Sequence, residues 1–440
     1  METAALEWVD GFIDSIRPYV HVRLTDNVLI RMPNQAFRLN RTGARTLHHL
    51  LAGGSIADII RHDGDGNVSR DLAVFFTDLS RVLSDELSDE HWSPAIRRSP
   101  FALGYIELPI LSEISLTFRC NLRCQFCYAA CRHVSEPAPK AEMDTKTVKD
   151  VLRIIRQDAE VPSVSFTGGE PMLRPDLPDL VAYARSLDMR VNLITNGTLI
   201  DRAVAATLKK RGLASAQVSI ESPEPAIHDR IVGQGGAHAA SVAGLHALQE
   251  AGVHVHPHTT LCAMNLDTAT LLPAFARSLG ATRCSANLVI PAGRGIDPEL
   301  ATTYREAAAL LPEIVAAARS ESIHFMWYSP IPVCLFNPVQ QGLGNKSCAA
   351  CEGLLSIDPS GQVLPCSSWP EPLGSILEDG FSRIWFGPRT RHIREKREAH
   401  PLCRPCPEFA LCQGACPLYF HAHDYDEIEP AIAAVGRNVS

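Results

Sequence analysis

The chain has 440 residues, which is too long for one hydrophobic core of ordinary size and favours two or three domains. Hydrophobic residues make up 46% and charged residues 20%, a globular composition that excludes a wholly disordered or collagen-like chain. The formal charge of −8 argues against a broad basic surface for nucleic acid.

The 14 cysteines are the most informative part of the composition. No apolar run of signal-peptide form precedes them, and no uninterrupted stretch of about 18 apolar residues suggests a membrane helix. We therefore expect a cytoplasmic protein without a membrane partner. In that reducing compartment, clustered cysteines serve as metal ligands or reactive thiols more often than as disulfides.

The N-terminal zone, which ends before the first cysteine, has the pattern of a small strand and helix module. Two short strand-like runs flank Pro33-Asn34-Gln35 within residues 27–40, which predicts a hairpin. Helical patterns follow over residues 41–51, 55–61 and 70–87, with Ser55 as a plausible N-cap. We expect the last helix to bury an apolar stripe made of Val74, Phe75, Leu79 and Val82.

The hairpin residues and the segment Leu39-Asn40-Arg41-Thr42-Gly43-Ala44 resemble the PqqD-like recognition element. That family is a winged-helix-like α+β domain that binds the leader of a ribosomally made precursor peptide. The resemblance implies a leader-recognition domain over residues 1–92. In the family the peptide adds to a strand edge beside a helix, so backbone bonds supply affinity and side-chain pockets supply specificity. The alternative is a packing domain that binds no ligand.

The middle zone alternates strand-like and helix-like patterns between two expected connectors, residues 93–100 and 291–298. After Asp144, a plausible N-cap, an amphipathic helix is expected with Val148, Val151, Leu152 and Ile155 on its apolar face. Such alternation predicts an α/β fold, a partial (β/α)6 barrel over residues 108–320 with function at the C-terminal strand ends. The expected strands are residues 114–117, 164–166, 191–194, 217–220, 253–259 and 287–290.

A cysteine loop follows the first expected strand of this barrel. Cys120, Cys124 and Cys127 have the spacing Cys-x3-Cys-x2-Cys. Three thiolates in one tight loop suit three corners of a [4Fe–4S] cube and leave one iron open. The alternative is a structural zinc site that uses Cys131 as its fourth ligand.

With Phe126 as the aromatic residue before its last cysteine, this loop resembles that of the radical S-adenosylmethionine (radical SAM) family. The resemblance implies that the three cysteines hold a [4Fe–4S] cluster whose fourth iron is chelated by SAM. One-electron cleavage of SAM would then produce a radical that abstracts a hydrogen atom from the substrate. An electron donor such as flavodoxin or ferredoxin is implied as a partner.

Further motifs lie at the ends of the later strands, where this family contacts SAM. In the segment Gly168-Gly169-Glu170-Pro171, the two glycines permit close approach of the backbone to a ligand, and the carboxylate suits the SAM amino group. The same four residues could also form an ordinary turn between a strand and a helix. The segment after the fourth strand departs from the family pattern at Glu221-Ser222. Which arginine contacts the SAM carboxylate is left open, and Arg230 is the candidate. The cofactor-binding residues implied by the resemblance are Phe126, Gly168, Gly169, Glu170, Pro171, Asn196, Ser219 and Arg230.

Three histidines alternate along the expected fifth strand. His254, His256 and His258 are two residues apart, so their side chains share one face. If that face is the barrel lumen, they are candidates for proton donors or substrate contacts. Otherwise they form a polar strand surface.

The C-terminal zone is dense in cysteine, and its spacing resembles the SPASM extension of radical SAM enzymes, here expected over residues 330–425. The resemblance implies two auxiliary iron–sulfur clusters, one held by Cys351, Cys366 and Cys416 and the other by Cys403, Cys406 and Cys412. No cysteine follows Cys416, so Cys334, Cys348, a residue among His421, His423 and Asp424, or an open site completes the sets. A zinc ribbon is the alternative for the late cysteines. Cys262 and Cys284 are expected to be buried packing residues.

The order of these segments predicts a peptide-modifying radical SAM enzyme that oxidatively changes or crosslinks the precursor peptide. One rival is a sulfatase-maturase-like protein oxidase, disfavoured because Ser367 stands where those relatives carry Asp. Another is a porphyrin or quinone cofactor biosynthesis enzyme. A non-catalytic iron–sulfur or zinc-binding adaptor is the rival from a different class.

Overall fold

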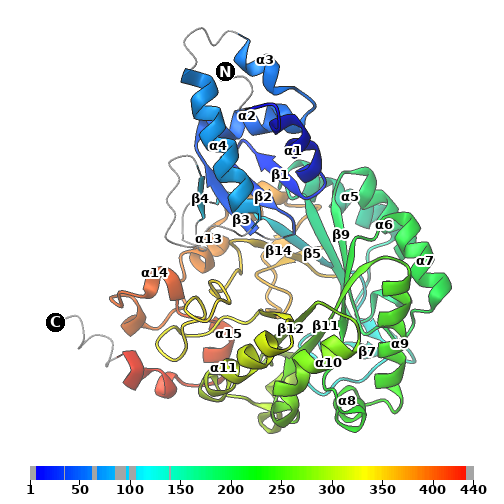
Figure 1. Cartoon of the computed structure of the whole chain (residues 1–440). Helices are drawn as coiled ribbons and strands as arrows, with labels where there is room; N and C mark the ends of the chain where they lie inside the picture. The colour runs from blue at the N-terminus through cyan, green and yellow to red at the C-terminus, as the bar shows by residue number, and fades with distance from the viewer. Residues whose placement is uncertain are drawn as a thin grey trace. The chain divides into compact units, whose positions relative to one another are not determined.

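The computed structural model describes residues 6–33, 35–61, 67–84, 96–98, 106–137 and 140–432. The chain divides into two compact units, residues 1–111 and residues 112–440, each with its own core (Figure 1). Within the described ranges, no helix has both the length and the apolar content that a membrane crossing requires.

Unit 1 combines an antiparallel sheet with helices. The sheet has the strand order β1-β2-β3-β4. The predicted hairpin is confirmed, because β2 and β3 pair antiparallel from Arg31 and Gln35 onward, while Asn34 lies outside the described residues. The elements are β1 (Val20–Arg23), β2 (Val28–Arg31), β3 (Gln35–Leu39) and β4 (Ile96–Arg98), with α1 (Val9–Ile16), α2 (Arg41–Leu51), α3 (Ile56–Ile60) and α4 (Asn67–Leu83).

Two details of unit 1 differ from the sequence prediction. Val74 is 54% exposed, so its place in the apolar stripe of α4 was wrong; Phe76, two residues later, is fully buried instead. The expected connector 93–100 contains β4, which pairs with β3 and buries Ile96 in the core. Ser55 caps α3 as predicted, through a reciprocal capping box with Asp58.

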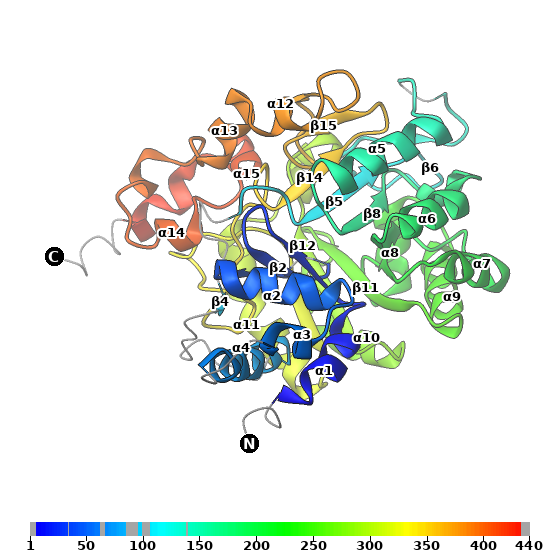
Figure 2. The same ribbon diagram turned by 90° about the horizontal axis from the view of Figure 1, so that it is seen from above.

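Unit 2 is built on one sheet, and helices cover the outer face of its parallel strands (Figure 2). Strands β5 and β8 to β13 pair in parallel, and β14 to β16 continue the sheet beyond β5 with antiparallel pairs. The strands are β5 (Leu111–Ser115), β8 (Ser163–Thr167), β9 (Arg190–Thr195), β10 (Ser215–Ser219), β11 (His254–Leu261), β12 (Arg283–Leu288), β13 (His324–Trp327), β14 (Leu354–Ile357), β15 (Gln362–Leu364) and β16 (Gly374–Ser375).

The helices of unit 2 alternate with the parallel strands as the α/β prediction required. Asp144 caps α5 by accepting a 2.7 Å hydrogen bond from the Thr147 N–H, and the four predicted apolar residues of this helix are buried. The covering helices are α5 (Thr145–Gln157), α6 (Leu177–Ser186), α7 (Arg202–Arg211), α8 (Pro225–Val232), α9 (Ala237–Glu250), α10 (Leu272–Ser278) and α11 (Tyr304–Ser320).

Three points of the strand prediction for the barrel need correction. The strand expected over residues 287–290 is β12, which begins earlier and ends at Leu288. The first strand ends at Ser115, two residues before its predicted end, because the chain leaves the sheet to form the cysteine loop. β13 was not predicted at all, although it pairs in parallel with β12. Its four residues, His324 to Trp327, are too short a run to show a period.

The inner face of the parallel strands is polar. Along β12, Cys284, Ala286 and Leu288 join the core formed with α10 and α11, so the alternating residues Ser285 and Asn287 face the other side. Similar alternation places polar residues on the inner face of neighbouring strands, where hydrogen bonds link Asn192 to Ser165 and Ser215 to Asn192. This inner face, called the lumen below, is therefore suited to a polar ligand.

Candidate active site

The first cysteine loop begins where a short strand leaves the barrel. Strand β6 (Arg119–Cys120) pairs in parallel with β7 (Arg132–His133), and these two strands carry the two ends of the loop. Cys120, Cys124 and Cys127 pack in one small apolar cluster with Cys131. The three thiols predicted as cluster ligands are thus brought together, and the additional thiol lies beside them.

Helix α8 holds the outer side of this loop through backbone bonds. The Arg123 and Gln125 N–H groups donate to the carbonyl oxygens of Val232 and Ile231, each at 2.9 Å. The Gln125 side chain donates to the Arg230 carbonyl oxygen at 2.8 Å. The Arg230 side chain itself is exposed, and a role in holding the SAM carboxylate stays a prediction.

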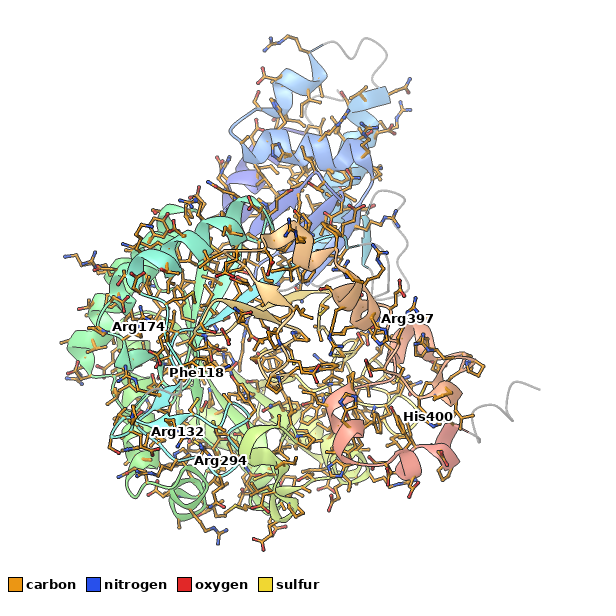
Figure 3. All side chains as sticks on the ribbon, turned by 180° about the vertical axis from the view of Figure 1, so that it is seen from behind. Phe118, Arg132, Arg174, Arg294, Arg397 and His400 are labelled. Carbon is orange, nitrogen blue, oxygen red and sulfur yellow. The ribbon has the colours of Figure 1, made fainter. Side chains whose placement is uncertain are left out.

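Arg294 holds the inner side of the loop and was not predicted. Its Nε donates to the Cys124 carbonyl oxygen at 3.0 Å and its Nη1 to the Cys131 carbonyl oxygen at 3.1 Å. Its backbone N–H donates to the Cys127 carbonyl oxygen at 3.0 Å. Figure 3 shows Arg294 near the loop that carries Arg132. One guanidinium therefore ties together both halves of the cysteine loop.

The segment that carries Arg294 connects β12 to α11, as expected for residues 291–298, but it also has a role at the cysteine loop that was not predicted. Residues Gly293–Ile296 form a short 3-10 helix packed on the cysteine loop. A Cβ on Gly293 would overlap the Tyr128 carbonyl oxygen, so glycine is required for this approach. The signal in the sequence was an arginine between two glycines in the loop that follows a barrel strand.

The Gly168-Gly169 pair makes the contact between the second barrel strand and the cysteine loop. The Gly169 N–H donates to the Thr117 carbonyl oxygen and the Glu170 N–H to the Arg119 carbonyl oxygen, both at 2.9 Å. A Cβ on Gly169 would overlap that Arg119 oxygen. The glycines thus permit close approach of the protein's own backbone, beside any role they have toward SAM.

The Glu170 carboxylate is completely buried and binds the end of the third strand. It accepts hydrogen bonds from the Thr195 hydroxyl at 2.8 Å, the Asn196 N–H at 2.9 Å and the Met172 N–H at 3.0 Å. Burial raises the pKa of Glu170 to about 7 despite these donors. Pro171 follows as the first residue of a 3-10 turn, so the motif positions two strand ends as well as any ligand.

Asn196 connects the third strand to the first cysteine. Its amide nitrogen donates to the Asn121 side chain at 2.9 Å and lies 3.9 Å from the Cys120 sulfur. Its amide oxygen accepts from the Thr198 hydroxyl at 2.7 Å. The Leu122 N–H also donates to the Cys120 sulfur, at 3.4 Å. Donors aimed at sulfur stabilise a thiolate and tune an iron–sulfur cluster.

The thiols of the loop differ in acidity. Burial raises the pKa of Cys120 to about 12 and holds that of Cys124 well above its usual range. The pKa of Cys127 is lowered, chiefly by a hydrogen bond from the Cys131 thiol and further by the Arg294 charge. Metal binding requires thiolates, so the nearby cation and sulfur-directed donors fit an iron–sulfur ligand set.

Phe126 packs in an apolar cluster separate from the one that holds the loop thiols. It contacts a buried apolar cluster that contains Ile231, Cys262, Val289 and Leu300. Cys262 is fully buried there, and Cys284 is buried in the core between β12 and α10, which confirms both as packing residues. Phe126 anchors the loop through its ring.

The inner face of β10 to β13 carries the predicted histidines and Ser219. His258 lies opposite Ser219 in the parallel register and bonds Ser285 at 2.8 Å and Asn287 at 2.9 Å through its two ring nitrogens. Its ring stacks on Tyr328 at 5.7 Å. Alternation places it opposite Leu261, which joins the helix-side core, so His258 faces the lumen.

The three histidines differ in their surroundings. His254 is exposed at the start of the strand, whereas His256 and His258 are progressively more enclosed. Burial lowers the pKa of His256 to about 3 and that of His258 to about 4, so both are neutral at neutral pH. The Nε2 atom of His256 has no hydrogen-bond partner among the described residues. Of the two, His256 keeps a ring nitrogen for a neutral hydrogen bond with a substrate, whereas both ring nitrogens of His258 are already bonded to the protein.

A carboxylate missed by the sequence reasoning lies near both cysteine regions. Glu113 on β5 accepts hydrogen bonds from the Ser356 hydroxyl at 2.6 Å and the Ser367 N–H at 3.2 Å. Burial raises its pKa, and its charge in turn helps to raise the pKa of Tyr128. Ser367 follows Cys366 directly, so this network joins β5 to the C-terminal cysteines. Only the fold brings Glu113 to this place.

One set of C-terminal thiols shares a single apolar cluster with Trp369, Ile393 and Leu418. Lys396 donates to the Cys348 carbonyl oxygen at 2.6 Å, and Arg394 to the Cys351 carbonyl oxygen at 2.8 Å. These cations surround a site that would be anionic when filled. The thiols of this set are Cys348, Cys351, Cys366 and Cys416.

The remaining C-terminal thiols line a separate cavity together with apolar side chains. They are Cys334, Cys403, Cys406 and Cys412. Among the described residues, no three His, Cys, Asp or Glu side chains converge as ligands of a single metal ion do. In a [4Fe–4S] cube each thiolate binds a different iron, so its sulfur ligands lie farther apart than those around one zinc.

Two family models match the chain. The model described as the radical SAM superfamily matches residues 114–270, and the model described as an iron–sulfur cluster-binding domain matches residues 321–407. The first range begins within β5, and the second contains most of the C-terminal thiols.

Curated relatives and solved structures are similar over long stretches. Fe-coproporphyrin III synthase of Methanosarcina barkeri is 36% identical over 336 residues, which cover 68% of this chain and 81% of the relative. PqqA peptide cyclase of Streptomyces rochei is 30% identical over 321 residues, 69% of this chain and 83% of the relative. The structure of Streptococcus suis SuiB bound to the precursor peptide SuiA has a TM-score of 0.69 at 16% identity, covering 92% of this chain and 96% of SuiB.

Proposed function

This chain belongs to the radical SAM superfamily, and from that membership we propose that it is a peptide maturase, which oxidatively modifies or crosslinks a ribosomally made precursor peptide. Its cofactors are SAM and [4Fe–4S] clusters. When bound, these groups supply one-electron reductive cleavage of SAM and abstraction of a hydrogen atom from the substrate. In the proposal, a flavodoxin or ferredoxin supplies the electron.

The chain's own residues would bind and orient the cofactors. Cys120, Cys124 and Cys127 are the proposed ligands of the SAM cluster, in a loop held by Arg294 and Asn196. The proposed SAM contacts are Gly168, Gly169, Glu170, Pro171, Ser219 and Arg230, with the lumen beyond them for substrate. Apolar packing around the thiols excludes water from the cluster.

Unit 1 is the part of the chain that is proposed to bind the peptide. Its sheet ends in the edge strand β4, which contacts α4, and an edge strand beside a helix is the place where an extended peptide can add by backbone pairing. The leader is proposed to pair there. Two comparisons support a peptide substrate: PqqA peptide cyclase is a curated relative, and SuiB, whose structure contains a bound precursor peptide, matches over 92% of this chain.

A porphyrin substrate is the second candidate, because Fe-coproporphyrin III synthase is 36% identical. The polar lumen with two neutral histidines is compatible with either substrate. The curated relatives named above match 68% and 69% of this chain. The part of the chain that they do not match is comparable in size to unit 1. A separate recognition unit is useful for a peptide and superfluous for a porphyrin.

The deciding experiment supplies both substrates to the same enzyme. Synthetic peptides encoded by short reading frames next to the gene, and Fe-coproporphyrin III, are incubated anaerobically with SAM and dithionite. The proposal expects 5′-deoxyadenosine formation that rises with one peptide and a peptide product that has lost hydrogen. Conversion of the porphyrin alone would overturn it. Cys124→Ala serves as the inactive control.

Leader recognition has a separate test on the whole enzyme. Hydrogen–deuterium exchange is measured with and without the modified peptide and with the same peptide lacking its N-terminal half. Slower exchange in β4 and α4, seen only with the intact peptide, is expected from strand pairing. Equal exchange under all three conditions would remove unit 1 from the proposal.

A further inference from the structure

We propose that Cys334 is the fourth thiolate of the second auxiliary [4Fe–4S] cluster, together with Cys403, Cys406 and Cys412. The proposal rests on the iron–sulfur domain match and not on the identity of the substrate. Among the described residues, no cysteine follows Cys416 in the chain, so this cluster needs a ligand from elsewhere. The fold supplies it from a segment about 70 residues earlier in the chain, between β13 and β14.

The cavity lined by Cys334 is the first line of support. Its lining brings Cys334 together with the three cysteines of the late group, Cys403, Cys406 and Cys412. Four of its lining residues are thiols, and much of the rest is apolar, including Val333, Phe409 and Ile428. An apolar cavity with four thiols is the surrounding expected for a cube bound by four cysteines.

The backbone next to Cys334 also donates a hydrogen bond to another of the proposed ligands. The Val333 N–H donates to the Cys412 sulfur at 3.4 Å, so this segment already contacts one proposed ligand. The same segment thus lines the cavity through Cys334 and bonds a second lining thiol through the neighbouring backbone.

The position of Cys334 is set by the core of unit 2. Ile331 and Phe336, on either side of it, are buried in the cluster formed with β12, β13 and α11. Between them the Leu335 and Phe336 N–H groups donate to the Pro332 carbonyl oxygen at 3.0 and 3.1 Å, which forms a turn. The thiol therefore projects from an anchored turn instead of a free loop.

The other candidates for this ligand lie elsewhere. Cys348 belongs to the first set of thiols, where Lys396 bonds its carbonyl oxygen. His421 lies against Trp369 and His423 against Tyr419. Within the described part of the chain, neither histidine nor Asp424 lines the cavity. Each auxiliary set thus has four thiols, and a cluster bound by four thiolates has no iron open to substrate.

The test replaces Cys334 and follows the clusters themselves. Cys334→Ala and, as matched control, Cys284→Ala are reconstituted anaerobically with iron and sulfide. Cys284 is buried in the same core, and its pKa is raised by burial with no contribution from another thiol. Its loss is therefore expected to leave every cluster intact. The proposal expects iron to fall from about twelve to about eight atoms per chain, or the EPR signal of a three-iron cluster, in the Cys334 variant only.

A second measurement guards against misfolding of the variant. In unmodified protein, alkylation by iodoacetamide is followed by mass spectrometry before and after anaerobic chelation of iron. Cys334 is expected to be protected before chelation and labelled together with Cys403, Cys406 and Cys412 afterwards. Full iron content and an unchanged EPR spectrum in folded Cys334→Ala, or labelling of Cys334 before chelation, would overturn the proposal. A failed search for a peptide substrate would leave this result unaffected.

Discussion

Cationic side chains in unit 2 hold cysteine loops by their carbonyl oxygens. Arg294 bonds the carbonyls of Cys124 and Cys131, and Lys396 and Arg394 do the same for two C-terminal cysteines. An iron–sulfur site with thiolate ligands is anionic, so a nearby cation stabilises it. A side chain that bonds the carbonyl places its charge near the cluster and leaves the sulfur free for iron.

Arg294→Lys is expected to weaken the first cluster. An ammonium group is a compact donor and cannot span two carbonyls as the planar guanidinium does. We expect SAM cleavage to fall by about 10- to 100-fold, the usual cost of losing a group that orients a metal ligand. The rate of 5′-deoxyadenosine formation checks it. Arg277→Lys is the matched control, since Arg277 is exposed and bonds Glu321. Equal rates in both variants would contradict the role.

Cys131 is expected to be dispensable as a ligand. Its thiol hydrogen-bonds to Cys127, but three ligands with one open iron are sufficient for this cluster type. Cys131→Ala should keep the iron content and SAM cleavage of the unchanged protein, whereas Cys127→Ala should lose four irons and all cleavage. Iron analysis of the two variants decides between them. Equal loss in both would favour a site with four protein thiolates, such as zinc.

Glu170 should make stability depend on pH. Its folded pKa of about 7 exceeds the ordinary value of 4.5, so the buried neutral form favours folding and this contribution is lost as pH rises through 7. The loss amounts to roughly 3 kcal/mol between pH 5 and pH 8. In Glu170→Gln it should disappear. Denaturant unfolding of both proteins across this range measures the difference, and parallel curves would refute it.

At the scale of elements, the junction between β8 and β6 decides where the cysteine loop begins. Two backbone hydrogen bonds join the Gly169 region to the strand before Cys120, and they form only at a separation too small for a side chain. The loop is therefore attached to the barrel on three sides: at β8, at α8 and at the 3-10 helix that carries Arg294.

Gly169→Ala is expected to separate this junction. The added Cβ overlaps a carbonyl oxygen of backbone, which cannot turn aside as a flexible side chain would. We expect destabilisation of about 1–3 kcal/mol and incomplete filling of the first cluster. Gly235→Ala is the control, because nothing lies within 4 Å of its added Cβ. Thermal unfolding and iron content measure both effects, and indistinguishable variants would argue against the junction.

The elements that escaped prediction share a cause. β13 and β4 have four and three residues, and such short runs carry no period. The 3-10 helix at Gly293–Ile296 has the composition of a loop. By contrast α5 and the hairpin of unit 1 were predicted correctly, because a cap with a regular apolar face, or two runs around a turn, are local signals.

At the scale of the whole molecule, the two units depend on metal to different degrees. Unit 1 contains no cysteine and has an apolar core of its own around Leu29, Leu47 and Phe76. In the C-terminal part of unit 2, thiols take up positions inside the apolar clusters. Where metal ligands replace core side chains, binding energy becomes folding energy.

Removal of iron should therefore loosen only one part of the chain. After anaerobic chelation, we expect faster hydrogen–deuterium exchange over residues 334–416, while α2 and α4 of unit 1 keep their protection. Peptide-level mass spectrometry before and after chelation measures both. A uniform increase over the whole chain would show that the units are not independent in stability.

The sequence by itself determined the chemistry of this protein, because a radical SAM loop and the two late groups of cysteines are defined by spacing over a few residues. It also determined the alternating strands and helices that place those motifs at strand ends. Only the tertiary structure decided which thiols form a set, and which side chains hold them. Cys334, Arg294 and Glu113 are far in sequence from the cysteines they adjoin, and spacing cannot report a contact that long loops and strand pairing create.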